Sequence, residues 1–300
     1  MIIKIGTRKS QLALIQTDLV LQQIKSYYPQ VKCEIVPIIT TGDTIINQAL
    51  YAIGGKALFL KEIEAALLDY KIDLAVHSLK DIPGHLPSGL MIGAVLTRES
   101  ANDVLVSFKA ASIQELPLRS IVGTSSVRRK IFLQNVRPDL RIVNFRGNVE
   151  SRLSKLKGAE VDATILALAG LKRLNILDHN YCNVIPIDQI LPAVGQGVIA
   201  VEIRENDIQM QEICAKLHDH STWELVQLER AFMKHMNATC KTPIAAYAEA
   251  IDQDQLEARF MIASACGNKV LFHRETGKIA NAEAIGISVA QQLTKSLLLI

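Results

Sequence analysis

The alternation of short apolar runs with amphipathic stretches constrains the fold of this chain more than any other feature. Runs such as 2–6, 33–38 and 74–77 have the length of strands, and the stretches between them space apolar residues as a helix does. Such alternation predicts α/β structure with largely parallel strands. The pattern starts again at residue 121, so we expect two α/β units around a cleft.

The last third of the sequence has a different pattern. A long helix is expected at 222–234, three strands follow one another at 244–249, 256–263 and 270–275, and a closing helix covers 282–297. This order predicts a small α+β domain. A strand at 198–203 could return to the first lobe. The expected domains are 1–97 with 196–216 (α/β domain 1), 98–195 (α/β domain 2) and 217–300 (α+β domain 3).

Composition limits the class of protein. Apolar residues make up 49% of the 300-residue chain and charged residues 21%, which is typical of a folded, soluble protein. No apolar run reaches the roughly 18 residues of a membrane span. The five cysteines form no CxxC pair, and His218 and His220 lack nearby ligands, so neither a disulfide framework nor a metal site is expected. We therefore expect a cytoplasmic protein.

Positive charge is concentrated in one window. Between Arg119 and Arg152 stand eight cations and two acids, while the whole chain carries a net charge of only +3. Seven of the eight are arginine, the side chain that binds carboxylate or phosphate with two parallel hydrogen bonds. A solvated basic face would give the same count.

Three expected strand-to-helix turns carry polar caps beside arginine. Free N–H groups and the helix dipole make such turns suitable for anions, although every helix also needs a cap. The residues concerned are Arg8 and Ser10 in the first turn, Thr124, Ser125, Ser126, Arg128 and Arg129 in the second, and Arg146, Gly147 and Arg152 in the third. Three turns of this kind favour a ligand with several acidic groups.

Two further segments carry reactive side chains. Lys80 and Asp81 follow a short apolar strand that Pro83 ends, and Asp81 either caps a turn or stabilises positive charge on a substrate. His77, within that strand, fits a packed, hydrogen-bonded histidine better than a catalyst. Cys240 lies in a polar loop beside Lys241, which would lower the pKa of an exposed thiol, although most single cysteines are structural.

Seven motifs stand in a defined order along the chain. They lie at 5–14, 54–59, 76–83, 122–129, 145–148 with Arg152, 167–173 and 191–197. On these motifs the chain resembles the porphobilinogen deaminases, also called hydroxymethylbilane synthases, over nearly its whole length. The resemblance implies two periplasmic-binding-protein-like α/β domains and a third domain that carries a cysteine on a loop.

The resemblance also implies an activity. Members of this family are cytoplasmic transferases of haem biosynthesis, monomers that join four porphobilinogen molecules head to tail into hydroxymethylbilane and release ammonia. A dipyrromethane cofactor, bound by a thioether to Cys240, would prime the reaction. Where the family usually has two glycines before this cysteine, the present chain has Ala238 and Thr239, and Ala245 stands at a third glycine position.

Roles of individual residues follow from the matched motifs. Asp81 would be the catalytic carboxylate, which stabilises the cationic azafulvene formed when ammonia leaves. The residues expected to bind cofactor and substrate carboxylates are Arg8, Ser10, Lys80, Thr124, Ser125, Ser126, Arg128, Arg129, Arg146, Gly147, Arg152 and Arg173. Lys56 and Phe59 would belong to a mobile loop.

Two other functions fit parts of the sequence. A non-enzymatic protein that binds a small organic anion would explain the arginines and the capped turns but gives no reason for Cys240. A nucleic-acid binder would need a wider basic surface and more stacking aromatics than Phe132 and Phe145. We expect neither a nucleic-acid nor a membrane partner.

Overall fold

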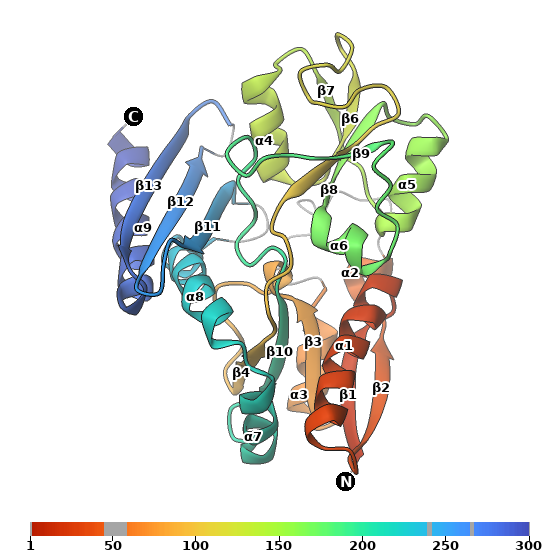
Figure 1. Cartoon of the computed structure of the whole chain (residues 1–300), viewed down its shortest axis with the longest axis vertical. Helices are drawn as coiled ribbons and strands as arrows, with labels where there is room; N and C mark the ends of the chain where they lie inside the picture. The colour runs from red at the N-terminus through yellow and green to blue at the C-terminus, as the bar shows by residue number, and fades with distance from the viewer. Residues whose placement is uncertain (1, 45–58, 239–241, 265–266, 300) are drawn as a thin grey trace. The chain divides into compact units, whose positions relative to one another are not determined.

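The computed structural model describes residues 2–44, 59–238, 242–264 and 267–299 (Figure 1). The chain forms two compact units, one of Met1–Glu99 with Val198–Glu224 and the other of Ser100–Gly197 with Leu225–Ile300. They are called unit 1 and unit 2 below.

Unit 1 is built on a mixed five-stranded sheet of order β2-β1-β3-β10-β4. Its strands are β1 (Ile2–Arg8), β2 (Lys32–Ile38), β3 (Leu74–Ser78), β4 (Leu90–Val95) and β10 (Ile199–Arg204). Strands β2, β1 and β3 are parallel, whereas β10 is antiparallel to both of its neighbours. The strand expected at 198–203 thus completes the first sheet.

Helices cover both faces of this sheet. They are α1 (Gln11–Tyr27), α2 (Thr41–Thr44), α3 (Lys61–Leu68) and α7 (Ile208–Leu217), with a 3-10 turn, η1 (Leu79–Asp81), directly after β3. Helices α1 and α7 bury Val20 and Ile213 against Ile5 of β1 on one face. On the other face, Leu67 of α3 packs against Ala75 of β3. Because both faces are covered, the central strands β3 and β10 are buried along almost their whole length.

Unit 2 contains a second five-stranded sheet, of order β7-β6-β8-β5-β9. Its strands are β5 (Asp103–Val106), β6 (Ile121–Gly123), β7 (Arg141–Val143), β8 (Ala163–Ala167) and β9 (Cys182–Val184), and its helices are α4 (Val127–Val136), α5 (Val149–Lys157) and α6 (Leu168–Arg173). Strands β7, β6 and β8 are parallel, and β5 is antiparallel to both of its neighbours, β8 and β9. The two sheets therefore repeat one arrangement of strand order and direction.

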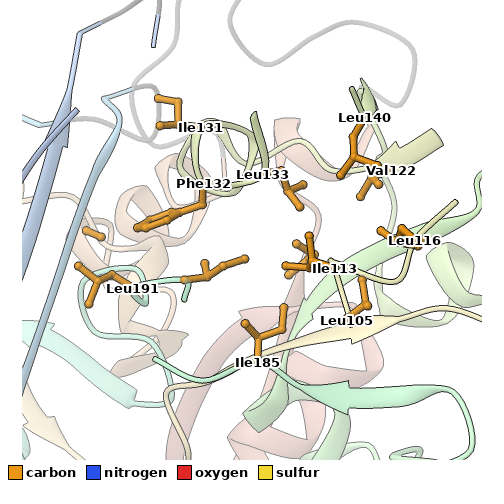
Figure 2. Close-up of a cluster of buried hydrophobic side chains, with 14 of the residues drawn as sticks. Leu105, Ile113, Leu116, Val122, Ile131, Phe132, Leu133, Leu140, Ile185 and Leu191 are labelled. Atoms are coloured by element: carbon orange, nitrogen blue, oxygen red, sulfur yellow. The ribbon is translucent and has the colours of Figure 1, made fainter. Parts of the chain in front are cut away.

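A three-stranded antiparallel sheet completes unit 2. It contains β11 (Ile244–Ala250), β12 (Gln255–Ala263) and β13 (Val270–Lys278), accompanied by η2 (Ile279–Asn281), α9 (Ala282–Leu299) and α8 (His220–His235), which begins in unit 1. Its core pairs Phe232 with Phe260. A second cluster joins this sheet to the five-stranded one, since Met261 is buried with Phe132 of α4 and Leu191 (Figure 2 shows the last two).

The architecture confirms the predicted fold class. The structure has two mixed α/β sheets and a small sheet-and-helix part at the C-terminal end. In each five-stranded sheet two strand pairings are parallel and two are antiparallel, so the expected largely parallel pairing holds for only half of each sheet. Two elements that the sequence pattern did not reveal are α7 and the short edge strand β9. Within the described residues, no helix is long and apolar enough to cross a membrane.

Candidate active site

In unit 1, the predicted residues lie at one edge of the sheet. Strands β1 and β3 are parallel neighbours, with Gly6 paired to Ala75, so both strands end at the same edge. Arg8 is the last residue of β1, and Lys80 and Asp81 form the turn that follows β3. In open α/β sheets, ligands bind at this carboxyl edge.

Arg8 is half-buried and already has two partners. Its guanidinium forms an ion pair with Asp43, and the Arg8 Nε lies 3.4 Å from the second oxygen of that carboxylate. The same guanidinium stacks 4.1 Å from the centre of the Phe59 ring. Burial raises the pKa of Asp43, but hydrogen bonds from Arg8 and Thr40 outweigh burial and hold it below its usual value. The structure thus brings Arg8 and Phe59 together and adds Asp43.

Ser10 is the N-cap of α1. Its hydroxyl oxygen accepts a hydrogen bond from the Ala13 N–H at 3.3 Å, which satisfies one of the free donors of the first turn. This bond leaves the hydroxyl hydrogen available for another acceptor. The geometry is compatible with both the cap and the predicted ligand-binding role.

Asp81 ends the short η1 turn and is half-buried. The residues before it are firmly held. Ser78 is hydrogen-bonded to Gln16 of α1 at 2.9 Å, and the Leu79 N–H donates to the Val198 carbonyl at 2.9 Å. The carboxylate predicted to be catalytic is therefore attached to a fixed strand end.

In unit 2, two strand-to-helix turns are bonded to each other. Ser125 follows β6, and its hydroxyl lies 2.6 Å from the Asn144 side-chain oxygen and 2.9 Å from the Phe145 carbonyl, both of which follow β7. Ser126 caps α4 by accepting from the Arg129 N–H, and the buried Thr124 accepts from the Ser126 N–H. The three hydroxyl residues thus shape one turn at the carboxyl edge of this sheet.

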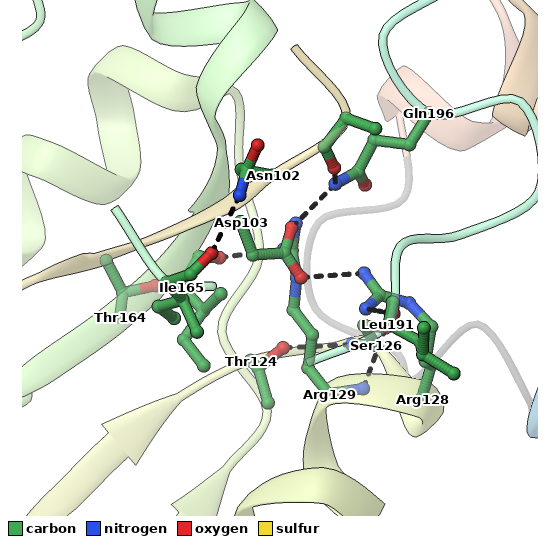
Figure 3. A network of polar contacts seen from close by, with 12 residues as sticks. Asn102, Asp103, Thr124, Ser126, Arg128, Arg129, Thr164, Ile165, Leu191 and Gln196 are labelled. Carbon is green, nitrogen blue, oxygen red and sulfur yellow. Dashed lines mark hydrogen bonds and ion pairs between the residues drawn. The ribbon is translucent and has the colours of Figure 1, made fainter. Parts of the chain in front are cut away.

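Arg128 and Arg129 are buried and share one carboxylate, that of Asp103 (Figure 3). Arg128 donates from Nη2 to Asp103 at 2.9 Å, and Arg129 donates from Nη2 at 2.7 Å and from Nε at 3.1 Å. Gln196 adds a further bond to Asp103 at 2.8 Å. Burial raises the pKa of Asp103, but the two guanidinium charges outweigh it and hold that pKa well below its usual range.

Each of these two guanidinium groups also donates to a backbone carbonyl. Arg128 donates to the Leu191 carbonyl and Arg129 to the Ile165 carbonyl, the latter at 2.7 Å. The two residues therefore fasten the start of α4 to β5, β8 and the 191–196 segment. Their predicted contact with substrate carboxylates stays a prediction, and it would have to share the guanidinium groups with Asp103.

The third predicted turn opens α5. Asn148 caps this helix by accepting from the Ser151 N–H at 2.8 Å, and half-buried Arg146 and Arg152 lie on either side of the cap. Gly147 has a φ of +125°, and a Cβ there would stand 1.9 Å from the Ser151 hydroxyl. Only glycine fits this position without strain, so the turn between Arg146 and Arg152 requires it.

Arg173 closes α6, which follows β8. Its Nη2 donates to the Gly197 carbonyl at 2.7 Å, so this arginine holds the glycine-containing 195–197 segment. Lys56, Cys240 and Thr239 lie outside the described residues, and the structure adds nothing to their predicted roles. Ala238 is buried, and Ala245 lies in β11.

Sequence reasoning missed the carboxylates that pair with the predicted cations. Asp103 opens the apolar strand β5, and an isolated acid in such a strand was the available signal. Asp43 and Gln196 gave no comparable signal, because only the folded chain brings them beside Arg8 and Asp103.

The fold is α/β, and the strand-to-helix turns of each unit carry arginine, hydroxyl and backbone N–H groups, which were predicted to bind an anionic ligand. Solved structures of similar shape include the periplasmic VFT2 domain of Bordetella pertussis BvgS (TM-score 0.44, 15% identity, covering 72% of this chain and 86% of that one). The methionine-binding protein MetQ gives a TM-score of 0.45 at 15% identity, covering 72% and 88% of the two chains. Likeness at this level supports no further argument.

Sequence comparison is decisive. Residues 3–212 match the family model described as porphobilinogen deaminase, dipyromethane cofactor binding domain, and residues 223–295 match the model of the porphobilinogen deaminase C-terminal domain. The porphobilinogen deaminases of Rickettsia canadensis and Rickettsia akari are each 55% identical over 295 residues, covering 98% of both chains. The chain belongs to the porphobilinogen deaminase family, a family of transferases, which confirms the resemblance seen in its motifs.

The described residues fit the cofactor that the family model names. A dipyrromethane with acidic side chains needs cationic and N–H donors, and the turn before α5 carries both kinds, in Arg146, Arg152 and the backbone N–H of Gly147. Among the described residues there is no group of three His, Cys, Asp or Glu side chains arranged to hold a metal ion.

Proposed function

We propose that this chain joins four porphobilinogen molecules head to tail into hydroxymethylbilane, with Asp81 as the catalytic residue. One observation carries the proposal: a single edge of the unit 1 sheet holds a guanidinium, Arg8, and a carboxylate, Asp81, on adjacent parallel strands. A substrate with acidic side chains needs a positively charged group to bind them, and its cationic transition state needs a negatively charged group to stabilise it. Ser10 and Lys80 add donors at the same edge.

Asp81 would act on the charge that develops when the substrate loses ammonia. The C–N bond of the aminomethyl group breaks, the nitrogen leaves as ammonia, and a positively charged azafulvene remains. A fixed carboxylate stabilises this cation more than it stabilises the neutral ring. After the new C–C bond forms, a ring carbon must lose its proton, and Asp81 would accept it.

The arginines would hold the growing chain by its acidic groups. Hydrogen bonds to charged groups contribute roughly 1.5–3 kcal/mol each. Arg146, Arg152 and the N–H groups at Gly147 form one such subsite, and the hydroxyls of Ser125 and Ser126 form another beside Arg128 and Arg129. Arg173 would act from the end of α6.

When bound, the dipyrromethane supplies the terminal ring to which new units are added. We propose that Cys240 holds it through a thioether, and that Lys56 and Phe59 belong to a loop that covers the substrate. The proposed domains are 1–97 with 196–216, 98–195 and 217–300, in a monomeric cytoplasmic enzyme of haem biosynthesis with neither nucleic-acid nor membrane partners.

The proposal is tested with purified protein and porphobilinogen. The expected result is release of one ammonia for each porphobilinogen consumed and formation of a linear tetrapyrrole that cyclises to uroporphyrinogen. If the protein binds porphobilinogen reversibly and releases no ammonia, it is a binding protein and the proposal is wrong.

A further inference from the structure

A buried cluster of ionisable side chains lies in unit 1, close to the residues assigned above but not among them. It consists of Glu64 of α3, His77 of β3 and Glu202 of β10, with 7%, 5% and 0% of their surfaces exposed. The His77 Nε2 lies 3.0 Å from the Glu202 Oε2. These three residues are called the buried triad.

The triad occupies the face of the sheet that α3 covers. Ala75 packs against Leu67 of α3, and His77, two residues further along the strand, points to the same face. Glu202 pairs with Ala75 and Ala200 with His77 in the β3–β10 ladder, so the His77–Glu202 bond crosses two adjacent strands diagonally.

Other charged groups on the surrounding elements have partners of their own. Arg204 of β10 donates to the Leu67 and Ile72 carbonyls and pairs with Asp207. Arg8 of β1 pairs with Asp43, and Glu62 of α3 accepts from the Thr41 N–H. The remaining charged residues of these elements are Lys4 and Lys61, and β4 has none. Within the described residues, no lysine or arginine is hydrogen-bonded to the triad.

Two buried carboxylates without a neighbouring Lys or Arg cannot both stay ionised at low cost. Burial, and then the charge of Glu202, raise the pKa of Glu64 to about 7. Glu64 therefore carries a proton over much of the range below neutral pH. Glu202 Oε1 and Glu64 Oε1 are buried and have no hydrogen-bond partner among the described residues. A protonated Glu64 could supply the donor that Glu202 Oε1 lacks.

We propose that Glu64, His77 and Glu202 form a proton-holding clamp that positions Asp81. The clamp deepens the proposed function and rests on it. His77 fixes β3 to β10 on the α3 face, Ser78 fixes it to Gln16 on the opposite face, and Leu79 continues the bond pattern to Val198. Asp81 is the second residue after Leu79, so its position depends on the strand end that the triad holds. His77 and Glu202 are positioning residues in this scheme and touch no substrate.

Substitutions at His77 separate positioning from mere burial. In His77→Gln, the amide nitrogen reaches the place of Nε2 and can still donate to Glu202, whereas His77→Leu fills the space and cannot. We expect His77→Leu and Glu202→Met, which both remove the His77–Glu202 bond, to lower kcat about tenfold or more with KM changed less than twofold, because a small misplacement of a catalytic group slows the chemical step. His77→Gln should keep kcat within about threefold of the parent.

The proton on Glu64 has two readouts. In the parent, Glu64 loses its proton, and with it the hydrogen-bond donor, between pH 6.5 and pH 8.5. Glu64→Gln keeps an N–H donor at both pH values, so its ratio of kcat at pH 8.5 to kcat at pH 6.5 should be about threefold higher than that of the parent. In the parent, the infrared band of a protonated carboxyl group should disappear as the pH rises through about 7, and Glu64→Gln should lack this band. The infrared test needs no turnover, so an inactive parent would refute the proposed function and leave the clamp to be judged by the band.

The matched control is Glu229→Gln, which makes the same change at a buried carboxylate of unit 2. Glu229 accepts from the Gly195 and Ala248 N–H groups, so the control should lower thermal stability without altering the pH dependence of kcat. The clamp is refuted if His77→Gln loses as much kcat as His77→Leu, or if the infrared band is absent. If His77→Leu does not fold, Glu202→Met decides: unchanged kcat refutes the clamp, and a selective loss of kcat supports it.

Discussion

The Arg8 guanidinium, which we propose binds a substrate carboxylate, is paired in this structure with the carboxylate of Asp43. The Phe59 ring lies against the same guanidinium. Asp43 keeps Arg8 extended at the end of β1, and it also competes with any acidic ligand for the same donors. A substrate acid must therefore replace one charge-assisted interaction with another of similar strength.

This competition predicts the effect of removing the Asp43 charge. Asp43→Asn should lower the KM for porphobilinogen about threefold, because Arg8 would no longer pair with an internal acid. Steady-state kinetics at fixed ionic strength measures the change. Asp18→Asn, at an exposed residue of α1 that accepts from Gln22, is the control and should leave KM unchanged. A rise in KM for Asp43→Asn would show that Asp43 serves to orient Arg8.

Asp81 carries the chemical step in the proposed mechanism. Asp81→Asn keeps the size of the side chain and removes its charge, so the protein should fold, bind its cofactor and turn over at least about a hundredfold more slowly. Asp69→Asn, at an exposed acid that pairs with Lys71, should match the parent. Near-normal turnover in Asp81→Asn would exclude the assigned role.

Asp103 should contribute to stability more than any exposed acid of unit 2. Asp103→Asn leaves two buried guanidinium groups without a counter-charge, which costs about 3–5 kcal/mol of unfolding free energy. Chemical denaturation measures the loss. Asp188→Asn, at an exposed carboxylate of unit 2 paired with Arg259, is the control and should change stability little.

The Asp103 network also predicts how stability depends on pH. Because the folded state lowers the pKa of Asp103, its stabilisation is present above the unfolded value of about 4 and is lost as the pH falls through the folded value. The parent should therefore lose stability in acid, and Asp103→Asn should lose less over the same range. Parallel acid-unfolding curves for the two proteins would contradict the assigned pairing.

Much of the fold followed from local patterns in the sequence. The caps at Ser10, Ser126 and Asn148 stand where the sequence placed the helix starts, because a cap depends only on residues a few positions away. Helix α7 was missed, although Asp207 caps it. Strand β9 was also missed, since a three-residue edge strand has no periodicity to detect.

For the candidate site, the sequence predicted the turns and their residue types but not the partners of those residues. Residue types and their turns were identified, because they lie in contiguous motifs. The partners of those residues were not identified. Asp103, the partner of Arg128 and Arg129, is bonded in turn to Gln196, which stands 93 positions further along the chain and meets Asp103 only after folding. Contacts at such separation leave no trace in a single sequence, and for that reason the occupied state of Arg128 and Arg129 could not be foreseen.

The most direct test of the central claim is the intact mass of the purified protein under denaturing conditions, followed by peptide mapping. The account predicts a mass increase equal to two porphobilinogen units less two ammonias, located on Cys240, and its loss in Cys240→Ala. Cys33→Ala, at a half-buried free thiol, should retain the adduct. A parent chain that stays unmodified after incubation with porphobilinogen, or an adduct that persists in Cys240→Ala, would contradict the account.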